Sequence, residues 1–328
     1  MKINPKKIIS KEKKRMIKFN NTFIIGIDHG YGNLKTANTV TPSGVKIHES
    51  EPPFKKFVLE YNGKYICVGE NHKFFVDDKT ADMDNYYLTL YGIAQELSLA
   101  GITDSHVHLA VGLPLMWYSE QRESFAEYLR QNEYVEFAYN GKIYHIHIDS
   151  ISVYPQGYCA VYDKLRDMDG VNMIADIGNG TMNILKVIDH KCIIDSCRTE
   201  KLGVERCVFR IRNAVMNKFH ECIDESIITK FFRNEEQELP EEYRKVMESC
   251  TADYCSDILA ALYNNEYNSK LMKLYVVGGG AIVMSNHNAN PPNTTFITDI
   301  CANAKGYEFQ AKRNLRKCAD GKDNKSQA

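Results

Sequence analysis

Two glycine-rich turns in this chain have residue types and spacings that could hold a polyphosphate. In both, an apolar segment ends in an aspartate, a Gly-x-Gly follows, and a second apolar segment begins after a small polar residue. Glycines let backbone N–H groups approach phosphate oxygens without a side chain in the way, and successive N–H groups form anion-binding concavities. The first turn contains Asp28, Gly30, Tyr31, Gly32, Asn33 and Lys35, and the second contains Asp176, Gly178, Asn179, Gly180 and Thr181.

The aspartates of these turns, Asp28 and Asp176, are the kind of ligand that Mg²⁺ uses. Magnesium is usually held by one or two carboxylates together with water and substrate phosphates. A single aspartate in a glycine turn often only stabilises that turn, but two turns of the same pattern favour a shared role. We therefore expect both aspartates to hold Mg²⁺ through water. Lys35 would neutralise phosphate oxygens, and Asn33 and Thr181 would form hydrogen bonds with them.

A third glycine turn follows an apolar segment near the C-terminal end and contains Gly278, Gly279, Gly280 and Ala281. Its backbone is expected to approach the α-phosphate and the nucleoside. Gly203 begins a predicted helix and is expected to form the other wall of the base pocket, with Glu205 and Arg206 at the rim. Charged residues in the first turn of a helix are, however, more often only solvated. Together the three turns predict a site for ATP or GTP with Mg²⁺.

Other nucleotide and metal motifs are absent or incomplete. The sequence contains neither the P-loop pattern G-x-x-x-x-G-K-[ST] nor a G-x-G-x-x-G after a predicted strand. Two H-x-H pairs, His106/His108 and His145/His147, each share one face of a predicted strand, but no third metal ligand is evident. The ten cysteines are scattered without C-x-x-C spacing, so we expect free thiols in a reducing cytoplasm.

The composition is typical of a globular protein with two domains. The chain has 328 residues, 44% of them hydrophobic, and a net charge of −1, so no strong overall charge directs it to nucleic acid or membrane. It lacks the run of about 18 apolar residues expected of a membrane-spanning helix, and no signal peptide is expected. Its first residues are strongly basic. We expect a solvated tail there, or a short basic helix that turns Ile8, Ile9, Met16 and Phe19 toward a membrane surface or anionic partner.

Hydrophobic periodicity and turn residues predict the elements that position the glycine turns. Asn62-Gly63 and Asn140-Gly141 predict two tight hairpins. Helices are expected over residues 86–100, from a Ser119 cap to residue 130, and over 203–219, 227–232 and 243–262, the last as one or two helices. Strands are expected over 23–27, 34–39, 106–111, 171–176, 182–188, 192–197 and 274–277, and 235–242 as a solvated loop. Because each half begins strand–turn–strand, the pattern favours two α/β domains with a cleft between them.

The order of these motifs resembles the actin-like ATPase superfamily. Residues 28–35 look like its first phosphate motif, 176–181 like its second and 276–281 like its adenosine motif. Residues 153–160 and 303–307 resemble its two interdomain connections. Residues 86–97 and 111–115 look like the ParM/StbA branch, the plasmid-segregation actins.

This resemblance implies an actin-like, ribonuclease H-like α/β fold with two related domains and mixed sheets around a nucleotide cleft. It assigns residues 22–156 and 303–318 to domain I and 157–302 to domain II. The remainder would be a basic, disordered extension at 1–21 and a disordered tail at 319–328. Gln156 stands where the family orients the attacking water, and Asp176 is the second catalytic residue. Asn179 stands where many relatives have glycine, and asparagine tolerates a left-handed backbone.

The implied activity is ATP hydrolysis with Mg²⁺, coupled to the dynamics of a filament in plasmid segregation. The implied partners are other copies of the chain and a DNA-binding adaptor of a partition system, without direct DNA contact by the folded body. Two alternatives stay open: a small-molecule kinase of the same superfamily, and a membrane-associated actin-like scaffold that uses the basic N-terminal segment.

Overall fold

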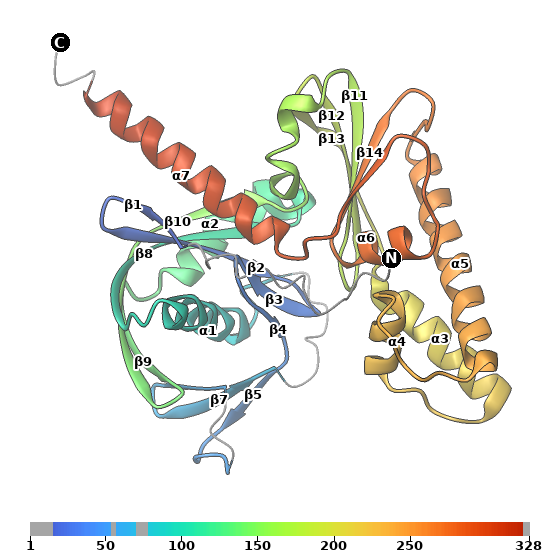
Figure 1. Cartoon of the computed structure of the whole chain (residues 1–328). Helices are drawn as coiled ribbons and strands as arrows, with labels where there is room; N and C mark the ends of the chain where they lie inside the picture. Colours follow the sequence, from blue (N-terminus) through green and yellow to red (C-terminus); the bar gives the residue numbers. More distant parts are fainter. Residues whose placement is uncertain (1–15, 54–56, 70–77, 324–328) are drawn as a thin grey trace, which may run out of the picture.

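The computed structural model describes residues 16–53, 57–69 and 78–323, and these form two α/β units side by side (Figure 1). We call the unit built on the larger sheet domain I. It contains β1 (Ile17–Phe19), β2 (Thr22–His29), β3 (Asn33–Thr36), β4 (Val40–Pro42), β5 (Val45–His48), β6 (Val58–Tyr61), β7 (Lys64–Val68), α1 (Asp84–Leu99), β8 (Asp104–Leu113), α2 (Leu115–Leu129), β9 (Tyr134–Tyr139), β10 (Lys142–Pro155) and α7 (Ala302–Asp323).

The unit built on the smaller sheet is domain II. It begins with two short 3-10 turns, Cys159–Val161 and Leu165–Asp167. Its other elements are β11 (Val171–Ile177), β12 (Met182–Ile188), β13 (Lys191–Glu200), α3 (Val204–Phe219), α4 (Glu225–Phe232), α5 (Glu241–Asn264), β14 (Lys273–Val277), α6 (Gly279–Asn286) and β15 (Thr294–Ile297).

Both sheets combine parallel central strands with antiparallel hairpins. The ten-stranded sheet has the order β4-β3-β2-β8-β10-β9-β6-β7-β5, with β1 paired to β2, and the five-stranded sheet has the order β13-β12-β11-β14-β15. Strands β2, β8 and β10 are parallel, as are β11, β14 and β15. The three glycine turns follow the carboxyl ends of β2, β11 and β14, which is where open α/β sheets commonly bind ligands.

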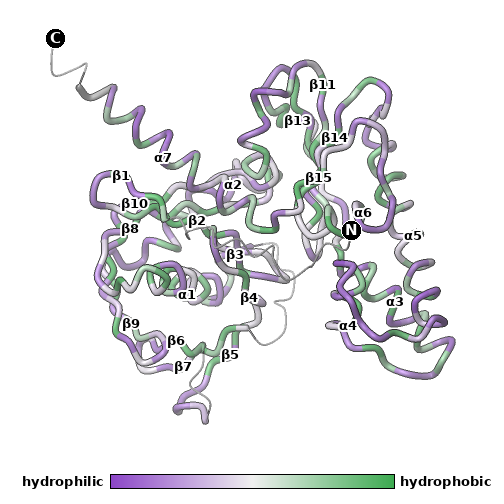
Figure 2. The backbone as a smooth tube through the Cα atoms, viewed as in Figure 1, coloured by the Kyte–Doolittle hydropathy of each residue, from purple (hydrophilic) through white to green (hydrophobic). Residues whose placement is uncertain are grey.

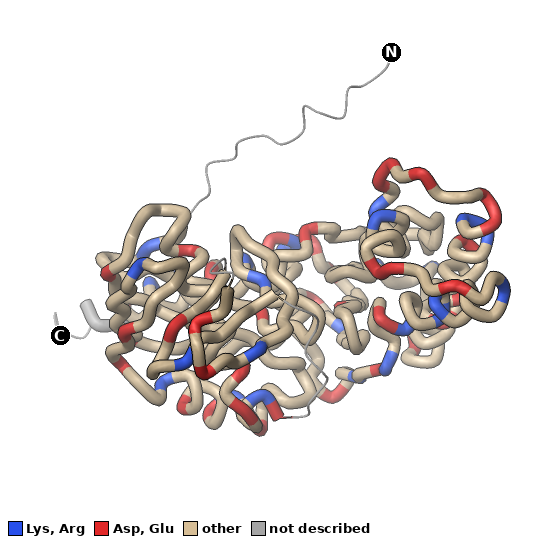
Figure 3. The backbone as a smooth tube through the Cα atoms, turned by 90° about the horizontal axis from the view of Figure 1, so that it is seen from below, with Lys and Arg blue, Asp and Glu red and all other residues tan. Residues whose placement is uncertain are grey.

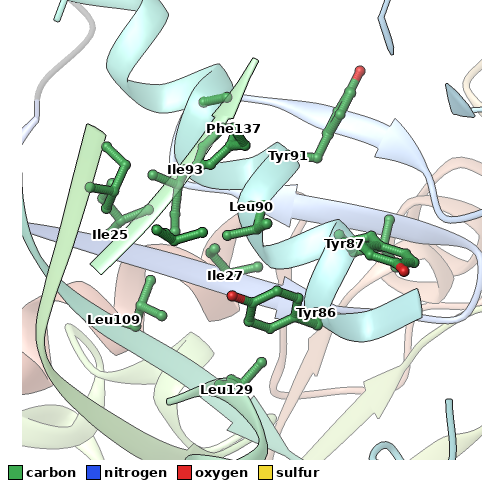
Figure 4. Close-up of a cluster of buried hydrophobic side chains, with 14 of the residues drawn as sticks. Ile25, Ile27, Tyr86, Tyr87, Leu90, Tyr91, Ile93, Leu109, Leu129 and Phe137 are labelled. Atoms are coloured by element: carbon green, nitrogen blue, oxygen red, sulfur yellow. The ribbon is translucent and has the colours of Figure 1, made fainter. Parts of the chain in front are cut away.

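The two asparagine–glycine hairpins are confirmed. Asn62 and Gly63 have φ values of 49° and 73°, and Asn140 and Gly141 have values of 50° and 73°. Two successive residues with positive φ match the right-handed twist of the paired strands, and Asn-Gly adopts this conformation readily. The predicted helix over 86–100 is also confirmed as α1, whose Leu90 and Ile93 lie against residues of the domain I sheet (Figure 4).

Helix α7 covers the other face of the domain I sheet and begins at the junction with domain II (Figure 1). Its Tyr307 is fully buried against β8, where a Cβ added at Gly112 would lie 2.0 Å from the Tyr307 hydroxyl oxygen. A Cβ at Gly26 of β2 would lie 2.1 Å from the Ala304 carbonyl oxygen. Both glycines therefore let the helix lie directly on the strands.

Three local predictions were wrong. Helix α2 begins at Leu115 after Pro114, not at a Ser119 cap, because proline has a fixed φ suited to a helix start. Strand β1 pairs with β2, so Phe19 belongs to a sheet and not to a basic helix, and residues 17–21 are an ordered part of domain I and not of a disordered extension. Helix α7 continues to Asp323, so residues 319–323 are helical although this outer part is mostly hydrophilic (Figure 2). The calls on Ile8, Ile9 and residues 324–328 lie outside the described residues.

The contact between Gly112 and Tyr307 predicts a measurable loss of stability in Gly112→Ala. The added methyl group forces α7 away from β8, and overpacking of this kind costs about 1–3 kcal/mol. Urea unfolding without nucleotide measures the effect. Gly180→Ala is the matched control, because its added Cβ meets nothing within 4 Å. Equal stability of the two variants would contradict the packing described here.

Candidate functional site

A cavity between the two domains brings together all three glycine turns. Thirteen of the predicted site residues line it: Asp28, Gly30, Tyr31, Gly32, Asn33, Lys35, Gln156, Asp176, Gly178, Asn179, Gly180, Thr181 and Gly279. The remaining six, Gly203, Glu205, Arg206, Gly278, Gly280 and Ala281, do not line it. The two hairpin turns come so close that a Cβ at Gly32 would lie 2.7 Å from the Asn179 Cβ.

Two buried aspartates face this cavity from different sheets. Asp28 in β2 is 2% exposed and Asp176 in β11 is 6% exposed. The β2–β3 hairpin pairs Asp28 with Lys35, whose Nζ lies 3.1 Å from Asp28 Oδ2. Gln156 Nε2 donates to Asp28 Oδ1 at 2.9 Å, and the side chain of Gln156 thereby reaches the first turn from the end of β10.

Asp176 is held by the second crossing between the domains. Asn303 Nδ2, in the first turn of α7, donates to Asp176 Oδ2 at 3.1 Å. Asn303 Oδ1 in turn accepts a hydrogen bond of 2.9 Å from the backbone N–H of Gly157. One side chain therefore ties Asp176 to both segments that connect the domains.

The charges of these groups are strongly coupled. Burial, and then the negative charge of Asp28, raise the pKa of Asp176 to about 6, while Asn303 and Lys35 act in the opposite direction. Burial by itself would lower the pKa of Lys35, but the negative charges of Asp28 and Asp176 outweigh it and the pKa is raised. Asp28 and Asp176 therefore share the ammonium group of Lys35, and the two carboxylates repel each other.

The second glycine turn is fixed by the start of α3. The N–H groups of Gly203, Val204 and Glu205 donate to the carbonyls of Gly180, Gly178 and Asn179, respectively. A Cβ at Gly203 would lie 2.0 Å from the Asn179 carbonyl oxygen. Gly203 thus supports the turn from behind and does not form a wall of the cavity, as the sequence had suggested.

The first turn of α3 presents different residues to the cavity from those predicted. Glu205 and Arg206 are exposed and line a separate hollow with Phe209. Val204 and Val208, one helical turn apart, line the cavity instead. The helical spacing of Val204 and Val208 indicates this face, whereas the prediction chose the neighbouring face with Glu205 and Arg206 because of its charges.

In the third turn, only Gly279 reaches the cavity. Gly278 has a φ of 81°, and a Cβ there would lie 2.5 Å from the Ile177 carbonyl oxygen. A Cβ at Gly280 would lie 2.3 Å from the Ile177 side chain, so this glycine lets α6 pack on β11. These two glycines shape the turn without contacting the cavity.

Sequence reasoning missed the apolar end of the cavity and part of its domain I wall. The apolar end is formed by Val204, Val208, Phe232, Ile282 and Val283, with Glu225, Thr229 and Arg233 as its polar residues. On the domain I side, Trp117 and Lys79 line the cavity, and Lys79 Nζ donates to the His29 carbonyl at 2.9 Å. These residues come from α2, α3, α4, α6 and a loop, so no sequence spacing connects them.

None of the ten cysteines lines the cavity. All ten cysteines are free thiols, and six of them are buried. Among the described residues, no helix combines the length and the apolar character needed to cross a membrane.

Comparison with known proteins identifies the architecture. Residues 26–158 match the family model of the N-terminal domain of actin-like proteins. An archaeal actin homologue superposes with a TM-score of 0.70 at 19% identity, covering 88% of this chain and 99% of the other. The chain has an actin-like fold. The expected α/β fold class and the resemblance to actin-like and ParM proteins are thereby confirmed.

Two further structures extend the comparison of this actin-like chain. An apo ParM protein of pSK41 has a TM-score of 0.69 at 17% identity, covering 92% of this chain and 99% of the other. A filament of Alp12 has a TM-score of 0.64 at 14% identity, covering 90% and 99%. The archaeal homologue was also solved in complex with ADP. The comparison with curated proteins found no match.

The raised pKa of Asp176 predicts an unusual pH dependence of stability. The folded protein binds the Asp176 proton more tightly than the unfolded chain does. Protonation of Asp176 therefore stabilises the fold fully below its ordinary pKa of 3.8, and this stabilisation is lost as the pH rises through about 6. Asp176→Asn removes the buried charge and keeps an acceptor for Asn303. Without nucleotide at pH 8 it should be more stable than the wild type by on the order of 1–3 kcal/mol.

Urea unfolding with EDTA, at pH 5 and pH 8, tests this prediction. Asp28→Asn is the contrasting variant, because it removes the carboxylate that pairs with Lys35 and should destabilise the protein at pH 8. If Asp176→Asn lowered stability as much as Asp28→Asn does, the electrostatic assignment would be wrong.

Proposed function

We propose that this protein is a filament-forming ATPase that binds ATP with Mg²⁺ in the interdomain cavity. The observation that carries the proposal is the convergence of Asp28 and Asp176, from two different sheets, on one cavity lined by glycine turns. ATP or GTP would place its phosphates between the two hairpin turns and its base among the apolar residues of α3, α4 and α6.

The residues present fit a metal-bound nucleotide. Mg²⁺ prefers carboxylate and other oxygen ligands and keeps several waters. The cavity offers two buried carboxylates that repel each other and that Lys35 neutralises only in part, so a divalent cation would relieve an existing electrostatic cost. When bound, the metal would supply charge neutralisation for the phosphates.

We assign Gln156 to the orientation of the attacking water. Its side chain ends at the cavity and is held by Asp28 at 2.9 Å, so its position is fixed by the same carboxylate that faces the phosphate turn. An amide cannot accept a proton as a strong base. Its contribution would therefore come from alignment of water, as in other phosphoryl-transfer enzymes.

The two segments that connect the domains, at Gly157 and at Asn303, would couple nucleotide binding to domain closure. We place the domain boundaries there, between Gln156 and Gly157 and between residues 302 and 303. Gly157 has a φ of 75°, and its N–H bonds Asn303, which also holds Asp176. A ligand that contacts both aspartates would therefore act on the segments about which the domains rotate.

We propose self-association because the chain has an actin-like fold and superposes on a subunit of the Alp12 filament. Head-to-tail contacts between identical subunits give open helical polymers unless the rotation closes a ring. In the view of Figure 3, acidic and basic positions are interspersed along the described backbone, and we propose that plasmid DNA is reached through an adaptor protein in the cytoplasm.

ATP with Mg²⁺ should produce filaments of the purified protein. Light scattering should rise after ATP addition, and negative-stain microscopy should show polymers that are absent with EDTA. The reason is that only the metal-bound nucleotide bridges the aspartates of both domains. A protein that stays monomeric at high concentration under these conditions would refute the proposed assembly.

Gln156→Ala and Asp176→Ala should separate catalysis from binding. Loss of water alignment in Gln156→Ala should slow ATP turnover roughly 100-fold while assembly persists. Asp176→Ala should reduce turnover to background and leave some nucleotide binding, because the turns and apolar wall stay intact. Phosphate release and fluorescent-nucleotide binding measure the two properties. Full turnover in Asp176→Ala, or loss of binding in Gln156→Ala, would contradict these roles.

The same assays address the two alternative functions. A small-molecule kinase would require a second substrate for phosphate release, whereas the proposed protein hydrolyses ATP by itself. A membrane-associated scaffold would pellet with liposomes only when the residues before Phe23 are present; the first fifteen of these lie outside the described residues.

A further inference from the structure

We propose that His106, His147 and Asp149 form a site for a borderline divalent cation, with Zn²⁺ as the representative ion, on strands β8 and β10 of the domain I sheet. None of the three residues lines the interdomain cavity. The three side chains offer two imidazole nitrogens and one carboxylate oxygen that all lie within 4.8 Å of one another.

The pairing of β8 with β10 brings the two histidines together. In this parallel pair His106 lies directly opposite His147, and the centroids of their rings are 4.8 Å apart. Both side chains are substantially exposed, at 58% and 43%. Ions from solvent can therefore reach the pair without any rearrangement of the fold.

A β-bulge adds the third ligand. The register of β10 on β8 shifts between Ile148 and Ser150, so Asp149 is an extra residue of β10. Bulges of this kind redirect a side chain. Here, Asp149 Oδ1 lies 2.7 Å from His106 Nδ1 and 2.8 Å from His147 Nδ1. A regular strand would turn Asp149 and His147 to the same face at a spacing of two residues, without this close approach to both rings.

The chemistry of the three groups suits zinc. Imidazole is a good ligand for zinc, copper and nickel, and zinc sites with three protein ligands leave one position for water or another donor. Bonds of about 2.0–2.2 Å in a tetrahedron put ligand atoms about 3.3 Å apart. The present separations between Asp149 Oδ1 and the two rings are shorter by about 0.5 Å, a shift that exposed side chains can make.

A neighbouring hydroxyl group orients the carboxylate. Thr22 Oγ1 of β2 donates to Asp149 Oδ2 at 2.6 Å, which leaves Oδ1 directed at the histidines. Hydrogen bonds to the far side of a ligand generally improve metal affinity by fixing its orientation. The site therefore spans β2, β8 and β10, three adjacent strands of the sheet.

The H-x-H pairs seen in the sequence are not the pairs that the fold makes. His108 is buried and its Nδ1 lies 2.6 Å from Ser150 Oγ. His145 Nδ1 lies 3.0 Å from Tyr134 Oη and 3.3 Å from Glu136 Oε2, both on β9. His145 is thus an exposed histidine on the same strand as His147 but outside the proposed set, which makes it a matched control.

Zinc titration of the full chain tests the proposal. The protein is treated with EDTA, desalted and titrated with Zn²⁺ alone in competition with a chromophoric chelator. The background carries Cys222→Ser and Cys318→Ser, because these two thiols are exposed and thiolates bind zinc. His106→Ala and His147→Ala should each weaken one zinc equivalent by about 10-fold or more, whereas His145→Ala should leave it unchanged.

Urea unfolding without metal should show that the three variants are equally stable, as expected for substitutions of surface residues. The proposal is overturned if the parent protein binds no zinc. It is equally overturned if His106→Ala binds zinc as the parent does, or if His145→Ala loses as much affinity as His147→Ala. Because the variants lie outside the interdomain cavity, ATP turnover in Mg²⁺ should be unaffected by all three, so failure of this site leaves the proposed ATPase untouched.

Discussion

The burial of two like charges in one cavity is the constraint on which the site depends. Asp28 and Asp176 come from different sheets, and the charge of the first raises the pKa of the second. Such an arrangement costs stability unless cations or hydrogen bonds compensate. Lys35, Gln156 and Asn303 compensate in part, and each belongs to a hairpin or a crossing that must be correctly placed for the two aspartates to be buried together. A site that is electrostatically incomplete is well suited to a ligand that brings its own divalent cation.

The same constraint links the site to the global architecture. The chain leaves domain I after β10 and returns through α7, and both crossings pass beside Asp176. Helix α7 then lies on β2 and β8 through the close approaches at Gly26 and Gly112. Movement of one domain therefore cannot leave the carboxylates unaffected, since the residues that hold them are the residues that connect the domains. This is a physical basis for coupling between ligand and domain orientation.

The two kinds of ligand set in this protein are chemically distinct. The cavity presents carboxylate and amide groups, which suit Mg²⁺, whereas the cluster of His106, His147 and Asp149 combines two imidazoles with one carboxylate, which suits zinc. The type of donor atom would therefore favour Mg²⁺ in the cavity and Zn²⁺ at the histidine cluster. The histidine cluster also lies on β8 and β10, so its geometry rests on the same parallel pairing that carries Gln156 to the cavity.

The sequence by itself determined the glycine turns, their aspartates and most of the elements around them, because these depend on neighbouring residues: Gly-x-Gly after an apolar strand, Asn-Gly between strands, and helical period in α1. It also indicated the actin-like fold through the order of motifs. Tertiary structure alone decided the rest. Which face of α3 meets the cavity, and that Asn303 holds Asp176, depend on packing between segments more than a hundred residues apart. The pairing of His106 with His147 was likewise invisible in the sequence, because strand register and a bulge at Asp149 set it. Local patterns cannot encode distances that arise only when separate strands are laid side by side.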